Sequence, residues 1–344
     1  MPQLRFDLTT ADWVVFAPLR SLRPRSKSTD PAAAPPASAV TSATCPFCPG
    51  NEGMTPREID AIRVSSGQSS DWQVRVVPNK FPALQIEEDN RRVSDGDVFQ
   101  QMGGCGAHEV VIESPDHNLF LGSQPTEQVS RVLAVLYRRY HDLMRDRRFQ
   151  SIIVFKNHGV GAGTSLQHPH WQIIATPVVP RMLRLKHNEA AAYFDRTGRC
   201  LYEVLLEQEL RRNERVVATN DEFAAVMPFA AHLPFETWIL PRRQQASFDL
   251  LRDEQIAPLA GILKEVLLKL YVGLENPDFN LTIDTASRGD ENEQFFCWHI
   301  RILPRLTTAA GFELGSGMSI NTVLPEEAAQ FLRGGNHAAP SAAP

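Results

Sequence analysis

The order of strand and helix patterns in the first half of the chain recurs in the second half, and this recurrence limits the fold more than any other feature. The first half has short β-branched strands and an amphipathic helix, at AHEVVIES (107–114), 126–148, SIIVFKN (151–157) and WQIIATPVV (171–179). The second half keeps that order, at ETWILP (236–241), 253–271, FNLTIDT (279–285) and CWHIRILPRL (297–306).

The spacing between equivalent positions of the two halves is almost constant. It is 127 residues from Glu109 to Glu236, 128 from Asn157 to Thr285, and 129 from His170 to His299. Such an offset indicates an ancient duplication, the alternative being chance similarity of short strands. Where the first half has His168, the second has Cys297. We therefore expect the reactive site in the first half and a scaffold or substrate surface in the second.

Bulk properties exclude several classes of protein. A chain of 344 residues holds one large or two ordinary domains. Its net charge of −5 argues against non-specific binding of nucleic acid. No apolar run approaches the ~20 residues of a membrane span, and the N-terminus lacks a signal-peptide pattern, so a cytoplasmic protein is expected. The Pro/Ala/Ser-rich segment 24–44 is expected to be a flexible loop, and 334–344 a disordered tail.

The stretch HPHWQ (168–172) places three polar side chains in a row. On a strand, His168, His170 and Gln172 share one face, because the side-chain period is two, and Trp171 points to the other face. Such a row is costly to bury unless it is used or paired. It can be a functional row or a set of satisfied core residues.

The preceding stretch, NHGVGAGTSLQ (157–167), favours the functional interpretation. Its three glycines let backbone N–H groups approach phosphate oxygens, and the hydroxyls of Thr164 and Ser165 can donate as well. It is neither a Walker loop nor a dinucleotide fingerprint. A glycine-rich loop that leads into a histidine strand suggests phosphoryl or nucleotidyl transfer to a neutral imidazole.

The motif CPFC supplies a second constellation, Cys45 and Cys48. It follows a Pro/Ala-rich segment and precedes a turn, which favours a zinc knuckle over a redox pair. Two histidines must then complete the site, and the candidates are His108, His117, His158, His168 and His170. His108 is otherwise interpreted as a structural strand-edge residue, and His158 as a loop residue that faces phosphate or solvent. Cys105, Cys200 and Cys297 are expected to be small packing residues.

These segments together resemble the galactose-1-phosphate uridylyltransferase family, a branch of the histidine-triad superfamily. The resemblance runs from about residue 13 to 333 and is carried by PLRSLRP (18–24), CPFCPGNE (45–52), VVPNKFPAL (76–84), ESPDH (113–117), FKNHGVGAGTSLQHPHWQ (155–172) and FAAVMPFAAHLPFETWILP (223–241). It implies an α+β fold of tandem duplicated histidine-triad-like halves, 1–180 and 181–333, each an antiparallel sheet with packed helices.

The resemblance also implies roles for individual residues. Zinc would be bound by Cys45, Cys48, His117 and His168. His170 would attack the α-phosphorus of a nucleoside diphosphate sugar, and Gln172 would hydrogen-bond the transferred group. Phosphates would be held by Asn157, Thr164 and Ser165 and neutralised by Arg20 and Arg23, with Asn79 near the nucleoside. Glu313 would contact sugar hydroxyls from the partner subunit, so a homodimer is implied.

The leading expectation is a uridylyltransferase of galactose metabolism, which exchanges UDP-glucose and galactose 1-phosphate through a nucleotidyl-His170. A second hypothesis is an ADP-glucose phosphorylase that uses the same histidine, because ILPRLTTAAGFELGSGMSIN (302–321) resembles that subgroup. A third is a zinc-stabilised nucleotide-binding protein without turnover. The family's well-studied members have a second metal site, which we expect to be absent, since Arg301 replaces a histidine.

Overall fold

The computed structural model describes residues 1–22, 41–64 and 71–334. Arg23, most of the predicted loop at 24–44 and the tail after Gly334 lie outside these ranges. Within them, no helix combines the length and the apolar character needed to cross a membrane.

The centre of the molecule is a ten-stranded sheet in which all neighbouring strands are antiparallel. The strand order is β10-β11-β12-β14-β13-β8-β9-β7-β4-β3. The bounds are β3 Asp60–Arg63, β4 Trp72–Pro78, β7 Ala107–Ile112, β8 Ser151–His158, β9 His170–Thr176, β10 Val216–Thr219, β11 Phe223–Val226, β12 Thr237–Pro241, β13 Phe279–Asp284 and β14 His299–Pro304.

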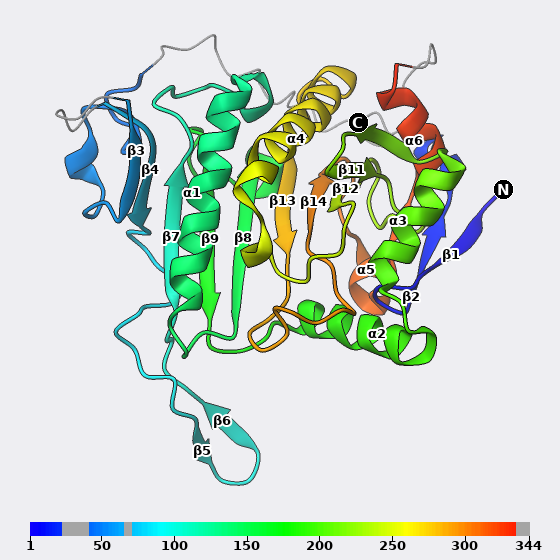
Figure 1. Ribbon diagram of the computed structural model, residues 1–344, viewed down its shortest axis with the longest axis horizontal. Coiled ribbons are helices and arrows are strands. Elements are labelled where there is room, and N and C mark those ends of the chain that lie inside the picture. Colours follow the sequence, from blue (N-terminus) through cyan, green and yellow to red (C-terminus); the bar gives the residue numbers. More distant parts are fainter. Residues whose placement is uncertain (23–40, 65–70, 335–344) are drawn as a thin grey trace.

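The sheet has an internal twofold arrangement. Strands β8 and β13 pair at its centre, and from there the order is β8-β9-β7-β4-β3 on one side and β13-β14-β12-β11-β10 on the other. This confirms the predicted tandem α+β halves and adds that they share one sheet (Figure 1). The pairing of β8 with β13 provides hydrogen-bond partners for backbone N–H and C=O groups that would lack them in each half alone.

Helices α1 (Thr126–Met144) and α4 (Asp253–Gly273) lie across the same face of this sheet, one over each half (Figure 1). Their apolar stripes, which include Leu136 and Leu263, belong to one continuous core with Trp171 and Ile300. The predicted helix at 126–148 ends four residues early, because the chain turns at Arg145.

The opposite face of the sheet differs between the halves. In the C-terminal half it is covered by α2 (Arg181–Thr197) and α3 (Leu201–Arg212), whose Leu183 and Leu206 pack with Val226 and Leu240. In the N-terminal half, among the residues that the structure describes, the same face carries a small cluster around Cys45, Phe47 and Val110. This half therefore keeps a face of the sheet on which a ligand can bind.

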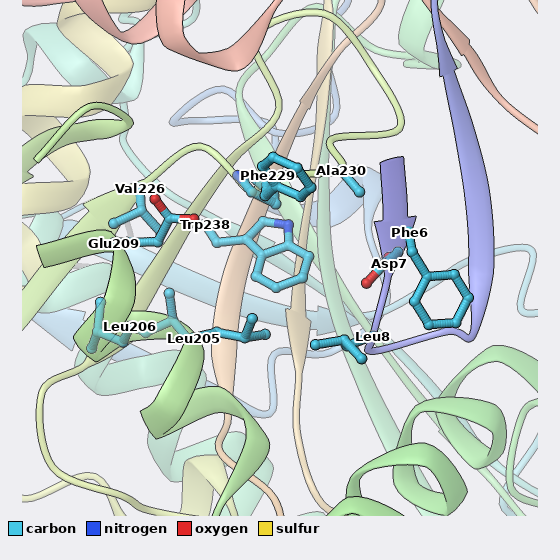
Figure 2. Close-up of a pocket in the computed structure, with 12 residues that line it drawn as sticks. Phe6, Asp7, Leu8, Leu205, Leu206, Glu209, Val226, Phe229, Ala230 and Trp238 are labelled. Carbon is cyan, nitrogen blue, oxygen red and sulfur yellow. The ribbon is translucent and has the colours of Figure 1, made fainter. Parts of the chain in front are cut away.

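The chain termini form a smaller unit beside the C-terminal half. Strands β1 (Gln3–Asp7), β2 (Asp12–Phe16) and β15 (Ile320–Asn321) make a three-stranded sheet, and α6 (Pro325–Leu332) follows. A cavity of about 90 Å³ separates β1 from Trp238 of β12 and is almost wholly apolar in its lining, with Leu8 and Leu206 among its walls (Figure 2).

The remaining elements are short. They are the hairpin β5 (Val93–Asp95) and β6 (Phe99–Gln101), the helix α5 (Gly311–Ser316), and the 3-10 helices η1 (Pro18–Leu22), η2 (Glu52–Met54), η3 (Leu121–Ser123), η4 (Val160–Ala162) and η5 (Phe248–Leu250).

Candidate active site and metal centre

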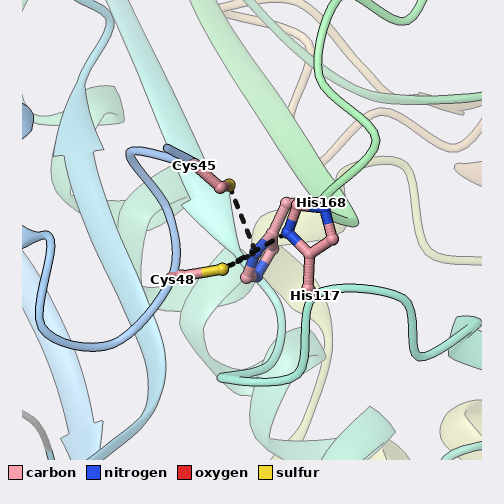
Figure 3. Close-up of side chains that lie close together, drawn as sticks. All are labelled: Cys45, Cys48, His117 and His168. Atoms are coloured by element: carbon pink, nitrogen blue, oxygen red, sulfur yellow. Dashed lines mark hydrogen bonds between the residues drawn. The ribbon is translucent and has the colours of Figure 1, made fainter. Parts of the chain in front are cut away.

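Four predicted metal ligands meet beside the start of β9. The donor atoms of Cys45, Cys48, His117 and His168 all lie within 4.8 Å of one another (Figure 3). Cys48 Sγ is 3.3 Å from Nδ1 of His117 and 3.6 Å from Nδ1 of His168. Two thiols and two imidazole nitrogens are a donor set that fits zinc, so the structure brings the predicted ligands together.

The surroundings of this cluster orient the ligands. Nε2 of His168 lies 2.8 Å from the carbonyl oxygen of Ser114, to which it donates, so the lone pair of His168 is on Nδ1 and faces the thiols. The amide of Asn51 donates to the carbonyl oxygens of Ser42, Ala43 and Cys45, which fixes the turn that carries both cysteines. A metal here would tie this turn to the strand that carries His170.

His170 has the geometry of a neutral nucleophile. Its Nδ1 donates to the carbonyl oxygen of His168 at 2.8 Å, which leaves the lone pair on Nε2. Burial lowers the pKa of His170 to about 4, more than the bond to the His168 carbonyl raises it. The imidazole is therefore neutral at neutral pH, with its one proton on Nδ1. The ring of Phe47 stands edge-on to it at 5.2 Å.

His170 opens onto a cavity of about 570 Å³ on the uncovered face of the N-terminal half. Its walls combine apolar side chains, among them Phe47, Pro56 and Phe81, with the predicted polar residues Asn79, Ser165 and Gln172. A cavity of this size, mostly apolar with a few convergent polar groups, suits a nucleotide-sized ligand.

The glycine-rich loop after β8 is held from the C-terminal half. Oδ2 of Asp278 accepts from the backbone N–H of Gly161 at 2.6 Å. Asn280 donates to Oδ1 of Asn157 and to the carbonyl oxygen of Ala162, both at 2.8 Å. One of the loop N–H groups, that of Gly161, is thus already bonded within the protein. The hydroxyl of Ser165 is exposed, and Ser165 stays a predicted phosphate contact.

Thr164 and Asn157 are structural neighbours of the cavity and do not belong to its walls. Oγ1 of Thr164 donates to the carbonyl oxygen of Asn157 at 2.9 Å. Because Oδ1 of Asn157 accepts from Asn280, its amide nitrogen is directed away from Asn280. Both residues stay predicted phosphate contacts.

Two further predicted residues lie away from His170 within the same chain. Arg20 is exposed near the end of η1, and Glu313 lies on α5, where its carboxylate accepts from the Ala310 N–H. Figure 1 shows α5 and β2 beside the C-terminal half, on the opposite side of the molecule from β7. Neither side chain contributes to the described cavity around His170.

The second half repeats the histidine geometry but buries the imidazole. Nδ1 of His299 lies 3.0 Å from the carbonyl oxygen of Cys297, as Nδ1 of His170 does from His168. The His299 ring, however, is fully buried against Tyr202 of α3. The ammonium of Lys186 and the guanidinium of Arg301 flank the nearby carboxylate of Asp284.

Sequence reasoning missed two features of the site. Lys156 and Glu113 form a fully buried ion pair of 2.9 Å below His170, and Nζ of Lys156 also reaches the His170 carbonyl oxygen. The period of two along SIIVFKN places Lys156 on the core face with Ile152 and Val154, so this burial could have been found. His108, interpreted as a strand-edge residue, contacts Gln172.

The sequence matches two family descriptions. Residues 1–180 match the galactose-1-phosphate uridyl transferase N-terminal domain, and residues 186–337 match its C-terminal domain. An ADP-glucose phosphorylase of Arabidopsis thaliana is 34% identical over 96% of this chain and 92% of its own length. A galactose-1-phosphate uridylyltransferase of Thermotoga maritima is 27% identical over 97% of this chain and 98% of its own.

Solved structures of the same two kinds of protein resemble this chain over almost its whole length. The crystal structure of an ADP-glucose phosphorylase from Arabidopsis thaliana with bound ADP-glucose has a TM-score of 0.83 at 31% identity, covering 97% of this chain and 98% of that one. A uridylyltransferase structure has a TM-score of 0.74 at 25% identity, with the same coverage.

Proposed function

The chain belongs to the galactose-1-phosphate uridylyltransferase family of nucleotidyltransferases, and from this premise we propose that it is an ADP-glucose phosphorylase acting through an adenylyl-His170 intermediate. The observation that carries the proposal is the state of His170, a neutral imidazole with its free nitrogen in a cavity of nucleotide size.

The relatives support adenylyl transfer more strongly than the uridylyl transfer that the sequence segments first favoured. The ADP-glucose phosphorylase is 34% identical to this chain, whereas the uridylyltransferase of Thermotoga maritima is 27% identical. The ordering of the two structural neighbours by TM-score, 0.83 against 0.74, agrees. This chain would then accept inorganic phosphate where a uridylyltransferase accepts a sugar phosphate.

The reaction would proceed by two displacements at one phosphorus atom. Nε2 of His170 attacks the α-phosphorus of ADP-glucose. The bond from that phosphorus to the oxygen bridging the two phosphates breaks, and glucose 1-phosphate leaves with the electron pair. An oxygen of inorganic phosphate then attacks the adenylyl phosphorus, the P–N bond breaks, and ADP is released. Gln172 can donate to the transferred group but cannot protonate it at neutral pH, which suits a leaving group that needs no proton.

We further propose that the Cys45/Cys48/His117/His168 cluster holds zinc. A Cys₂His₂ zinc ion would be a closed structural site, and its contribution would be to fix His168, two residues before the nucleophile at the start of β9. Neither of the two displacements requires the zinc ion.

A homodimer would complete the sugar side of the site. Arg20 and Glu313 lie outside the cavity around His170 of their own chain, although the family resemblance gives them substrate contacts. The partner subunit's Glu313 would then reach the sugar hydroxyls. Mixing His170→Ala and Glu313→Ala chains would test this, because a mixed dimer regains one intact site and both pure variants lack activity.

Intact-protein mass spectrometry tests the main proposal. The protein is mixed separately with ADP-glucose and UDP-glucose, without acceptor, and we expect one added adenylyl group with ADP-glucose. His170→Ala should show none, whereas His141→Ala, a surface histidine on α1, should behave as wild type. A uridylyl adduct alone would replace the proposal with uridylyl transfer. No adduct with either sugar nucleotide would favour a binding protein without turnover.

The acceptor is identified in a second step with the isolated adduct. Inorganic phosphate should remove the adenylyl group and release ADP, while galactose 1-phosphate should leave it in place. Release by galactose 1-phosphate alone would contradict the phosphorylase assignment and keep the adenylyl-His170 intermediate.

A further inference from the structure

His108 lies on β7, next to the strand β9 that carries Gln172. In the antiparallel pairing of these strands His108 faces Ile174 and Val110 faces Gln172, so His108 and Gln172 are diagonal neighbours on one face of the sheet. His108 does not line the described cavity around His170. It lines the adjacent cavity, with Asn79 and Arg139. Any effect of His108 on the reacting group must therefore pass through a neighbour.

Two backbone N–H groups, of Ala83 and Phe81, determine which nitrogen of the His108 ring carries the proton. The N–H of Ala83 points at Nδ1 from 3.1 Å, and a backbone amide can only donate, so Nδ1 carries the lone pair. Nε2 then carries the proton. The Asn79 amide nitrogen, 3.1 Å from Nε2, can only donate and so cannot accept this proton. The Phe81 N–H donates to Asn79 Oδ1, so the oxygen of this amide does not face His108.

The acceptor for the His108 Nε2–H is Oε1 of Gln172, at 2.8 Å. This bond settles the otherwise ambiguous orientation of the Gln172 carboxamide. With the oxygen turned toward β7, the NH₂ group is at the other end of the carboxamide. Gln172 lines the His170 cavity, so the donor end of the side chain is the one offered to a ligand there.

We propose that His108 is a positioning residue, which holds the Gln172 amide with its NH₂ group toward the phosphoryl group that His170 receives. The inference rests on the proposed nucleotidyl transfer and deepens it. A phosphoryl oxygen is anionic and accepts hydrogen bonds. An amide flipped by 180° would present its own oxygen instead, which repels the phosphoryl group. His108 removes the flipped state before substrate binds, as preorganised donors do in other active sites.

A double-variant cycle tests whether His108 acts through Gln172. The measurement is the first-order rate of adenylyl-His170 formation at saturating ADP-glucose, for wild type, His108→Ala, Gln172→Ala and the double variant. We expect Gln172→Ala to slow the step by about 100-fold and His108→Ala by about tenfold. The double variant should be no slower than Gln172→Ala alone, because without the amide His108 has nothing to orient.

Further variants separate positioning from a structural role. His108→Gln can still donate to Gln172 Oε1 and should recover part of the rate that His108→Ala loses. His141→Ala, the surface control, should leave the rate unchanged. If the double variant loses the two factors multiplied together, or if His108→Ala reacts at the wild-type rate, the proposal is overturned.

A measurement without substrate tests the role of His108 independently of the proposed reaction. Nitrogen-15 NMR of the histidine rings should show His108 as the neutral tautomer protonated at Nε2, and the Gln172 side-chain amide resonances should shift in His108→Ala. Protonation at Nδ1 would overturn the positioning role even in a protein that forms the adduct. If wild type forms no adduct, the proposed function fails, whereas the tautomer still decides whether His108 orients Gln172.

Discussion

Nε2 of His168 lies 2.8 Å from the carbonyl oxygen of Ser114, and this bond determines that Nδ1 is the nitrogen that His168 turns toward the two cysteines. The Cys₂His₂ cluster and His170, the proposed nucleophile, are thereby coupled through residues 168–170, because the His168 carbonyl oxygen accepts from His170 Nδ1. The cluster can fix the position of His170 without any contact with substrate.

Cys45→Ala is expected to abolish zinc binding and to lower the thermal midpoint, because three remaining donors leave the tetrahedral site incomplete. Metal analysis of the purified protein measures this. Cys105→Ala is the matched control, since Cys105 is also a buried cysteine but lies outside the cluster. Full zinc content in Cys45→Ala would exclude Cys45 as a ligand.

We expect no metal at the position of His299 in the second half. Lys186 and Arg301 place two positive charges around Asp284, and a cation there would be repelled. Zinc and iron analysis of protein grown with both metals should find only the zinc that Cys45→Ala removes. Any metal retained by Cys45→Ala in a stoichiometric amount would contradict this expectation.

Lys156→Met should destabilise the fold by about 3–5 kcal/mol, because it leaves the Glu113 carboxylate buried without its partner. Urea unfolding gives the free-energy difference. Arg138→Met, which breaks an exposed pair with Asp60, should cost about 1 kcal/mol or less. Adding Glu113→Gln to Lys156→Met should restore much of the lost stability. An equal loss of stability in Lys156→Met and in Arg138→Met would contradict the argument.

Gly159→Ala should impair the glycine-rich loop. Gly159 has a φ of 83°, and an added Cβ would lie 1.7 Å from Oδ1 of Asp278. Strain of about 1–3 kcal/mol and a displaced loop should follow, which a slower rate of adduct formation and a lower midpoint of unfolding would report. Gly261→Ala, in the middle of α4 with open space around it, should instead stabilise by up to about 1 kcal/mol.

The ion pair between His232 and Asp7, 3.0 Å long, should make stability depend on pH. Burial would lower the pKa of His232, but the bond to Asp7 and the carboxylate of Glu236 raise it above its usual value. Burial would raise the pKa of Asp7, but the bonds from His232 and Thr9 bring it to about 2. The His232 contribution is complete below its unfolded pKa of about 6.5 and is lost as pH rises through the raised value.

The Asp7 contribution has the opposite sign, since it is complete above about pH 4 and is lost as pH falls toward 2. The pair is therefore fully formed between about pH 4 and 6.5. There, His232→Gln should cost on the order of 2 kcal/mol in urea unfolding, and the cost should shrink at alkaline pH. A cost that grows above pH 7 would reverse the argument. His141→Gln, at an exposed pair, should cost about 0.5 kcal/mol or less throughout.

Much of the fold and the metal site could be predicted because both follow from local patterns. The period of two along β9 gave the shared face of His168, His170 and Gln172, and the offset between His170 and His299 gave the duplication. The burial of His299 in the second half could not be predicted, since it depends on α2 and α3 packing over β11 and β12. The boundary after residue 180 and the cytoplasmic location stay predictions.

The unpredicted parts of the site are contacts between distant segments. Asp278 and Asn280 reach the glycine-rich loop because β13 pairs with β8. The sequence around 278–280 has no pattern that predicts this pairing. His108 looked like a strand-edge residue because its role depends on Ala83, whose N–H selects the tautomer. The proposal of an adenine donor likewise rests on the relatives more than on the motifs.

The pairing of β8 with β13 makes the two halves inseparable, although His170, the proposed nucleophile, lies in the first half. A fragment that stopped after the first half would expose the whole hydrogen-bonding edge of β8 and would lose the Asp278 carboxylate that anchors Gly161. The second half therefore supports the site of the first half. Its tolerance to substitution should be lowest along β13, where a change would weaken both the pairing with β8 and the contacts that hold the glycine-rich loop.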